Sequence, residues 1–179
     1  MTATLGADGP ETSPSAYGFD DLLAANRVFA RRFALGGFDG IAHRGIALVT
    51  CMDSRIDPLR MLGLSPGDAK IFRNPGGRVD EAAMEALILG VHLLRVRRIL
   101  IVPHTRCAVA TSTEAQLHER LRASAGVDTT WQKLHVIDDQ EATVRYDVHR
   151  VRSHPLIPAE VVVGGFMYDV DTGLLAPVA

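Results

Sequence analysis

The pattern of apolar and polar residues predicts strands that alternate with helices along the chain. Four stretches carry apolar residues at helical spacing, and they predict helices at residues 20–34, 80–96, 111–126 and 139–154. Short, β-branched apolar runs predict buried strands at residues 46–50, 70–74 and 98–104, and residues 160–178 predict two strands joined by a turn. This order is typical of an α/β fold. We therefore predict a mainly parallel sheet of about four to five strands flanked by helices, with an antiparallel strand at one edge.

The first residues differ from the rest in composition. Residues 1–17 are rich in Gly, Ser, Thr and Pro and show no periodicity, which predicts a flexible N-terminal arm. Residues 18–179 suit one domain, because roughly 100–200 residues form a domain. Hydrophobic residues make up 47% and charged residues 22% of the chain, as is typical of a globular protein. We therefore predict a single domain, residues 18–179, after the arm.

The charge balance narrows the classes of partner. Nineteen Lys and Arg residues against 21 Asp and Glu residues give a formal net charge of -2. This leaves no broad basic surface, so we expect neither a nucleic acid nor an acidic membrane as a partner. No stretch reaches the roughly 20 apolar residues of a membrane span, and the N-terminus lacks the basic and apolar regions of a secretory signal. We expect a cytoplasmic protein.

Two cysteines and one histidine provide the clearest candidate chemistry. Cys51 and His104 fall at the carboxyl ends of predicted strands, where open α/β sheets bind ligands. Cys107 follows His104 by three positions, so the two side chains can reach one ion. Two thiolates, one imidazole and an open fourth position are typical of a catalytic zinc site. Simple burial of the cysteines, or thiol chemistry without a metal, stays open on these residues alone.

Asp53 and Arg55 follow Cys51 with the same parity. In an extended chain the three side chains point to one side, which places a carboxylate and a guanidinium beside the candidate ligand. Such a pair can orient groups bound to a metal. A solvated surface ion pair without a chemical role is the alternative.

Three linked motifs connect these residues to a known family. CMDSR, IFRNPGG and HTRC occur in an order and spacing that resembles the β-class carbonic anhydrases, over roughly residues 45–107. The resemblance implies a β-carbonic anhydrase-like fold and the reversible hydration of carbon dioxide to bicarbonate by zinc-bound hydroxide. It also implies a homodimer or higher homo-oligomer, in which the N-terminal helix packs across the subunit boundary.

The resemblance also implies a role for each candidate residue. Cys51, His104 and Cys107 are the implied metal ligands, and they hold one Zn²⁺ per chain. Asp53 and Arg55 are the implied catalytic dyad beside the fourth ligand position. A second possibility stays open: Asp53 occupies that position itself when its pairing with Arg55 is lost, and the site is then closed.

Four positions depart from the family pattern. Arg106 precedes the second cysteine, where a small or acidic residue is common, and Ala108 follows it, where Gly is usual. Pro103 stands before the histidine, where Gly is common. Pro75 stands in the Arg-Asn-x-Gly-Gly stretch at a position where a small residue other than Pro is usual. These changes spare the implied ligands and dyad, and they bear on pocket shape, substrate access and rate.

Three other functions stay open. The first is a carbonyl sulfide or carbon disulfide hydrolase. These enzymes share this ligand set, because the same nucleophile can attack the electrophilic carbon of either substrate. A non-catalytic zinc-binding dimer module is the second. A cysteine phosphatase is the weakest, because such enzymes place five residues between Cys and Arg, whereas three separate Cys51 from Arg55.

Two further groups of polar residues remain without an assigned role. A tight turn after a strand explains the first group better than an anion-binding nest, and this group comprises Arg73, Asn74, Gly76 and Gly77. Imidazole titrates near neutral pH, so the remaining histidines are possible proton shuttles: His43, His92, His118, His135, His149 and His154. His92 lies in an apolar helical pattern and is predicted to belong to the core, and the others are predicted at the surface.

Overall fold

The computed structural model describes residues 18–179, so the predicted arm at residues 1–17 lies outside the described residues. The described residues fall into two compact units, with the boundary between residues 37 and 38. In the first unit, α1 (Asp20–Ala30) begins with two aspartates, which suit the positive end of a helix dipole, and it buries none of its residues. The single domain predicted for residues 18–179 stays a prediction.

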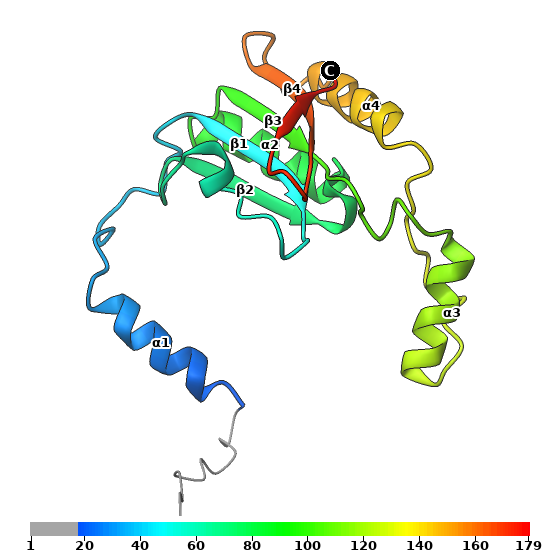
Figure 1. Ribbon diagram of the computed structural model, residues 1–179. Coiled ribbons are helices and arrows are strands. Elements are labelled where there is room, and N and C mark those ends of the chain that lie inside the picture. Colours follow the sequence, from blue (N-terminus) through cyan, green and yellow to red (C-terminus); the bar gives the residue numbers. More distant parts are fainter. Residues whose placement is uncertain (1–17) are drawn as a thin grey trace, which may run out of the picture. The chain divides into compact units, whose positions relative to one another are not determined.

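A five-stranded sheet with the order β2-β1-β3-β4-β5 forms the centre of the second unit (Figure 1). Its strands are β1 (Ile46–Cys51), β2 (Ala69–Asn74), β3 (Arg98–Val102), β4 (Val162–Tyr168) and β5 (Leu175–Pro177). The first four are parallel, and β5 pairs antiparallel with β4 at the edge. These pairings confirm the predicted α/β fold and its antiparallel edge strand. All six residues of β1 are buried, as expected for a strand with neighbours on both sides.

Three helices belong to the same unit: α2 (Glu81–Leu93), α3 (Glu114–Ala125) and α4 (Gln140–Arg152). α2 and α4 contribute to the larger core cluster, which includes Val49 and Ile101 of the sheet. Leu48 and Val102 belong to a second cluster, which also contains both cysteines. Because neighbouring strand residues point to opposite faces, the two clusters occupy the two faces of the sheet.

Capping side chains explain where these helices begin. Each accepts a hydrogen bond from a backbone N–H in the first turn, and the three capping residues are Asp80, Thr113 and Asp139. Each helix starts one residue after its cap, which refines the predicted boundaries. No helix within residues 18–179 is long and apolar enough to cross a membrane.

The strand register brings the carboxyl ends of the central strands together. Cys51 at the end of β1 is aligned with Asn74 of β2, and Thr50 is aligned with Val102 of β3. An isolated parallel bridge joins His104, beyond β3, to Tyr168 of β4. The residues that follow these strands therefore emerge at one edge of the sheet.

Candidate metal centre

Cys51, His104 and Cys107 come from the carboxyl ends of two adjacent strands. Cys51 is the last residue of β1, and the other two lie in the segment after β3. The backbone of Tyr168, at the end of β4, hydrogen-bonds over 2.9 and 3.0 Å to the residues on either side of His104. The three central strands thus fix the positions of both halves of the candidate site.

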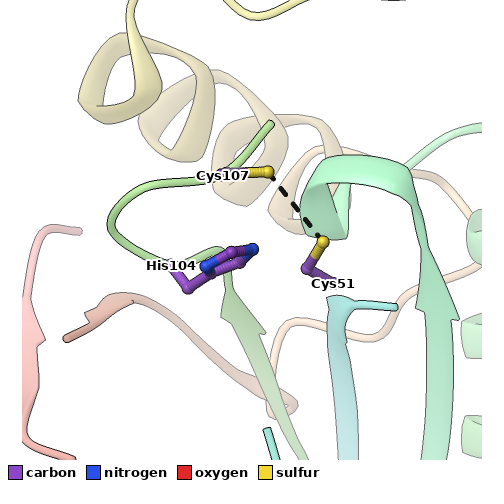
Figure 2. A group of neighbouring side chains, drawn as sticks. All are labelled: Cys51, His104 and Cys107. Carbon is purple, nitrogen blue, oxygen red and sulfur yellow. Dashed lines mark hydrogen bonds between the residues drawn. The ribbon is translucent and has the colours of Figure 1, made fainter. Parts of the chain in front are cut away.

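Figure 2 shows the three side chains pointing toward one another. Their potential donor atoms all lie within 4.8 Å of one another, and the two Sγ atoms are 3.9 Å apart. The exposed fractions are 4% for Cys51, 0% for His104 and 2% for Cys107. The structure therefore brings together, in a buried place, the three residues that the sequence predicts as ligands.

The distance between the sulfurs fits a zinc ion. Two zinc–sulfur bonds of ~2.3 Å at a tetrahedral angle separate the sulfurs by about 3.8 Å. The observed 3.9 Å between Cys51 Sγ and Cys107 Sγ is close to this value. Two sulfurs and one nitrogen are also donors that zinc prefers.

His104 provides a second, independent indication that this place suits a metal ion. Its Nδ1 lies 2.8 Å from the backbone carbonyl of Thr105, which only accepts hydrogen bonds, so Nδ1 carries the proton. The Nε2 atom then offers a lone pair, and this buried atom has no hydrogen-bond partner among residues 18–179. A buried polar atom without a partner is costly unless a ligand satisfies it. This orientation, with the tautomer fixed by the backbone, suits a metal ligand.

The two thiols differ in their electrostatics. The hydrogen bond between them lowers the pKa of Cys51, with smaller contributions from His104 and from the backbone N–H of Gly76. The same contact, together with burial, raises the pKa of Cys107. Cys51 therefore loses its proton readily. Deprotonation of Cys107 is opposed by the negative charge of the Cys51 thiolate. A bound cation removes this opposition, because thiols release their protons when they bind a metal.

Asp53 and Arg55 form a bidentate ion pair next to the three candidate ligands. Arg55 Nε donates to Asp53 Oδ1 over 2.9 Å, and Nη2 donates to Oδ2 over 2.8 Å. The Arg55 guanidinium holds the pKa of the Asp53 carboxyl well below its usual range. Asp53 Oδ2 lies 3.7 Å from His104 Nε2. The predicted pair therefore borders the candidate ligands.

The route by which this pair forms differs from the sequence argument. Strand β1 ends at Cys51 and the chain turns at residues 54–55, so the alternation of an extended chain does not apply there. Instead, the backbone N–H of Arg55 donates to Asp53 Oδ1 over 2.9 Å, which closes a local turn. The condition of an extended chain is therefore not met, and the side-chain carboxylate that closes the turn brings the two residues together.

Arg73 has a role that the sequence did not reveal. Its guanidinium donates to the backbone carbonyls of Cys51, Asp53 and Ile56, over 2.9, 2.6 and 3.3 Å. Arg73 therefore holds the loop that carries Asp53 and Arg55 against the end of β2. The available signal was an arginine at the end of a strand, but its carbonyl partners depend on the pairing of β1 with β2.

The turn predicted after β2 is present as a short 3₁₀ segment, η2 (Pro75–Gly77). The backbone N–H of Gly76 donates to Cys51 Sγ over 3.3 Å. At Gly77, where φ is +66°, an added Cβ would lie 2.9 Å from the backbone nitrogen of Cys51. Glycine is required there by both the backbone conformation and the close approach. This segment is the tight turn that the sequence favoured, and it also contacts a candidate ligand.

Arg106, one of the departures from the family pattern, lies beside the dyad. Its φ is +55°, a left-handed conformation that is uncommon outside glycine. In this conformation its carbonyl accepts a hydrogen bond of 3.4 Å from Arg55 Nη2, and its own guanidinium pairs with Asp171 over 2.5 Å. Arg106 therefore connects the segment between two candidate ligands to the dyad.

The prediction for His92 was wrong. This residue is exposed on α2, and its Nε2 lies 2.8 Å from the carbonyl oxygen of Leu156. The apolar pattern of α2 suggested burial, but His92 lies on the part of the helix that the core does not cover.

Known proteins share this fold and are similar to the chain in sequence. A family model described as carbonic anhydrase matches residues 46–175. The chain is 33% identical to β-carbonic anhydrase 1 from Mycobacterium tuberculosis over 156 residues, which cover 87% of this chain and 94% of the relative. A solved structure of carbonic anhydrase from Streptococcus mutans superposes with a TM-score of 0.80 at 35% identity, covering 90% of this chain and 97% of that one.

A relative named for a different activity is also similar. Carbon disulfide hydrolase from Acidithiobacillus thiooxidans is 28% identical over 169 residues, which cover 82% of this chain and 84% of the relative. The chain is therefore similar both to proteins named as carbonic anhydrases and to a protein named as a carbon disulfide hydrolase.

Proposed function

The chain belongs to the β-carbonic anhydrase family, and from this premise we propose that it is a zinc-dependent carbonate dehydratase. The proposed reaction is the reversible hydration of carbon dioxide to bicarbonate. One observation carries the proposal: the buried Nε2 of His104 has no partner among the described residues and lies with two cysteine sulfurs within 4.8 Å. A ligand set of this kind leaves a fourth tetrahedral position for the reaction.

In this proposal Cys51, His104 and Cys107 hold one Zn²⁺ per chain. Zinc, when bound, supplies Lewis acidity, which makes a water molecule a better nucleophile. The two thiolates balance the charge of the ion within a buried site. The Nδ1–H of His104, fixed on the carbonyl of Thr105, keeps the imidazole oriented toward the sulfurs.

Asp53 and Arg55 would position the reacting groups. Asp53 is ionised because Arg55 depresses its pKa, so its carboxylate accepts hydrogen bonds and does not donate them. Both carboxylate oxygens are paired with Arg55, which holds Asp53 back from the fourth ligand position. This pairing favours the open form of the site over the form that Asp53 closes.

Hydrolysis of carbon disulfide or carbonyl sulfide on the same site is the alternative, and the similarity to carbon disulfide hydrolase favours keeping it. The test is to supply the three gases separately to the zinc-loaded protein and to measure the rate with each. We expect carbon dioxide to have the highest kcat/KM, with protein stripped of metal by a chelator as the background. Consumption of carbon disulfide without carbon dioxide hydration above that background would overturn the proposed substrate.

The proposal includes a homodimer or higher homo-oligomer in the cytoplasm. The exposed apolar residues of α1 support association, since Leu22 is 61% and Phe29 is 62% exposed. A non-catalytic zinc module would give the same assembly, and it differs by holding zinc without hydration activity. A thiol enzyme without metal fits less well, because the guanidinium of Arg55 is occupied by Asp53.

A further inference from the structure

The turn after β2 contacts a candidate ligand through one hydrogen bond. Gly76 N–H donates to Cys51 Sγ over 3.3 Å, and the sulfur is buried with the rest of Cys51. A hydrogen bond to a thiolate withdraws charge from the sulfur and fixes its direction. The position of the turn therefore affects how Cys51 presents its sulfur.

Asn74 closes the turn from within. Its side-chain oxygen accepts from the backbone N–H of Arg78 over 2.8 Å, and its Nδ2 donates to the carbonyl of Arg78 over 2.7 Å. The same Nδ2 donates to the carboxylate of Asp80 over 3.1 Å. These bonds shape the turn locally but do not attach it to the rest of the domain.

A buried carboxylate from a distant helix supplies that attachment. Asp147 of α4 is 1% exposed and accepts from Arg78 Nε over 2.7 Å and from Nη2 over 3.2 Å. It also accepts from the backbone N–H of Val79 over 3.1 Å. Burying a carboxylate is costly, so a fully bonded carboxylate at this position indicates a specific requirement.

We propose that Asp147 and Arg78 are positioning residues for the metal centre, because they hold the turn at which Gly76 donates to Cys51 Sγ. The inference rests on the proposed function, since it requires Cys51 to be a metal ligand. Asp147 lies 69 residues from Arg78 along the chain, so α4 is coupled to the ligand shell through the folded structure.

The test compares Asp147→Asn and Arg78→Gln with the wild-type chain. Zinc affinity is measured by chelator competition, and the thiolate-to-metal absorption band is recorded after loading with Co²⁺. We expect each variant to bind zinc about tenfold more weakly, as removal of ligand-supporting hydrogen bonds commonly does. We expect the cobalt band to move to longer wavelength, because a sulfur that loses its hydrogen bond becomes a better electron donor.

Val151→Ala is the matched control on the same helix. Val151 is fully buried in the main core, so its truncation lowers the melting temperature without removing a contact to the turn. The control should keep the wild-type cobalt band and zinc affinity. The double variant Asp147→Asn with Arg78→Gln should lose little more zinc affinity than either single variant, because both act through one contact.

The outcomes separate this inference from the proposed function. Wild-type affinity and band in the folded Arg78→Gln and Asp147→Asn variants would overturn the positioning role and leave the metal site intact. The same shift in Val151→Ala would also overturn it, since general destabilisation would then explain the effect. A wild-type chain that binds neither Zn²⁺ nor Co²⁺ would overturn the proposed function itself. If Asp147→Asn does not fold, Arg78→Gln alone decides, because Arg78 is partly exposed.

Discussion

Asp53 receives three hydrogen bonds from one neighbour, Arg55. They come from the backbone N–H and from two guanidinium nitrogens, over 2.8 to 2.9 Å. This arrangement fixes both the charge and the direction of the carboxylate. A carboxylate that is ionised and fixed next to the candidate ligands suits orientation of a reacting group, which contributes to rate without contributing to metal binding.

Asp53→Asn should therefore reduce carbon dioxide hydration by about 100-fold, the scale on which small errors in orientation act. The amide keeps the shape of the side chain but accepts less strongly and loses its ion pair with Arg55. Zinc content should stay at the wild-type level, because Asp53 is not a proposed ligand. Initial hydration rates and metal analysis on the same preparation check both statements.

Asp57→Asn is the matched control for this variant. Asp57 lies in the same loop, is exposed, and is 3.9 Å from the guanidinium of Arg60. The Asp57→Asn variant should hydrate carbon dioxide at the wild-type rate. An Asp53→Asn variant with unchanged rate, or with zinc lost, would contradict the role given to Asp53.

At the scale of residues, the sequence identified candidate ligands where the residue type alone indicates the chemistry. Two features identified the candidate ligands. Cys51 and Cys107 are the only cysteines of the sequence, and His104 is a histidine at the end of a predicted strand. Arg73 and Asp147 were not, because their partners are backbone carbonyls and a residue 69 positions away. Such contacts depend on which elements become neighbours, and local patterns do not carry that information.

At the scale of elements, the parallel register of β1, β2 and β3 builds the site. Their carboxyl ends align, so loops that are distant in sequence meet at one edge of the sheet. The alternation of strands and helices predicted this arrangement and the antiparallel edge strand. It did not fix the helix ends: residues 20–34 suggested a helix that extends to residue 34, whereas α1 ends at Ala30.

The turn η2 gives an element-scale prediction. Gly77→Ala should destabilise the protein by at least about 2 kcal/mol, because left-handed backbone and overpacking costs combine. The added Cβ would lie 2.9 Å from Cys51 N and 3.0 Å from Thr50 C, and backbone atoms cannot move aside cheaply. Zinc content should fall as well, since the end of β1 must shift. Urea unfolding and metal analysis measure the two effects.

Gly126→Ala provides the comparison. Gly126 also has a positive φ, of +71°, but an added Cβ there meets no atom within 4 Å. Its cost should be about 1 kcal/mol, from backbone conformation alone, with zinc content unchanged. Equal costs for the two substitutions would show that the close approach to β1 has no energetic consequence.

At the scale of the whole molecule, the proposed function includes association of chains. The motifs implied an N-terminal helix that packs across a subunit boundary, and α1 exposes several large apolar residues. These residues are Leu22, Leu23, Val28 and Phe29. Exposed apolar groups that gather on one helix are typical of an interaction surface.

Replacing Leu22 and Phe29 together by Ser should weaken self-association by at least roughly 30-fold, since loss of a buried aromatic anchor typically costs about 2 kcal/mol or more. Sedimentation velocity over a concentration series measures this. Arg27→Ser, an exposed polar position on the same helix, should leave the association constant unchanged. A wild-type chain that sediments as a monomer at all concentrations would contradict the proposed assembly.

The central claim is that Cys51, His104 and Cys107 hold one zinc ion that is required for hydration of carbon dioxide. The most direct measurement is zinc content and hydration rate of the wild-type chain and Cys107→Ser, side by side, with circular dichroism to verify folding. We expect about one zinc per chain and hydration in the wild type, with both lost in the variant. A wild-type chain that hydrates carbon dioxide without zinc, or a folded Cys107→Ser variant that keeps both, would contradict it.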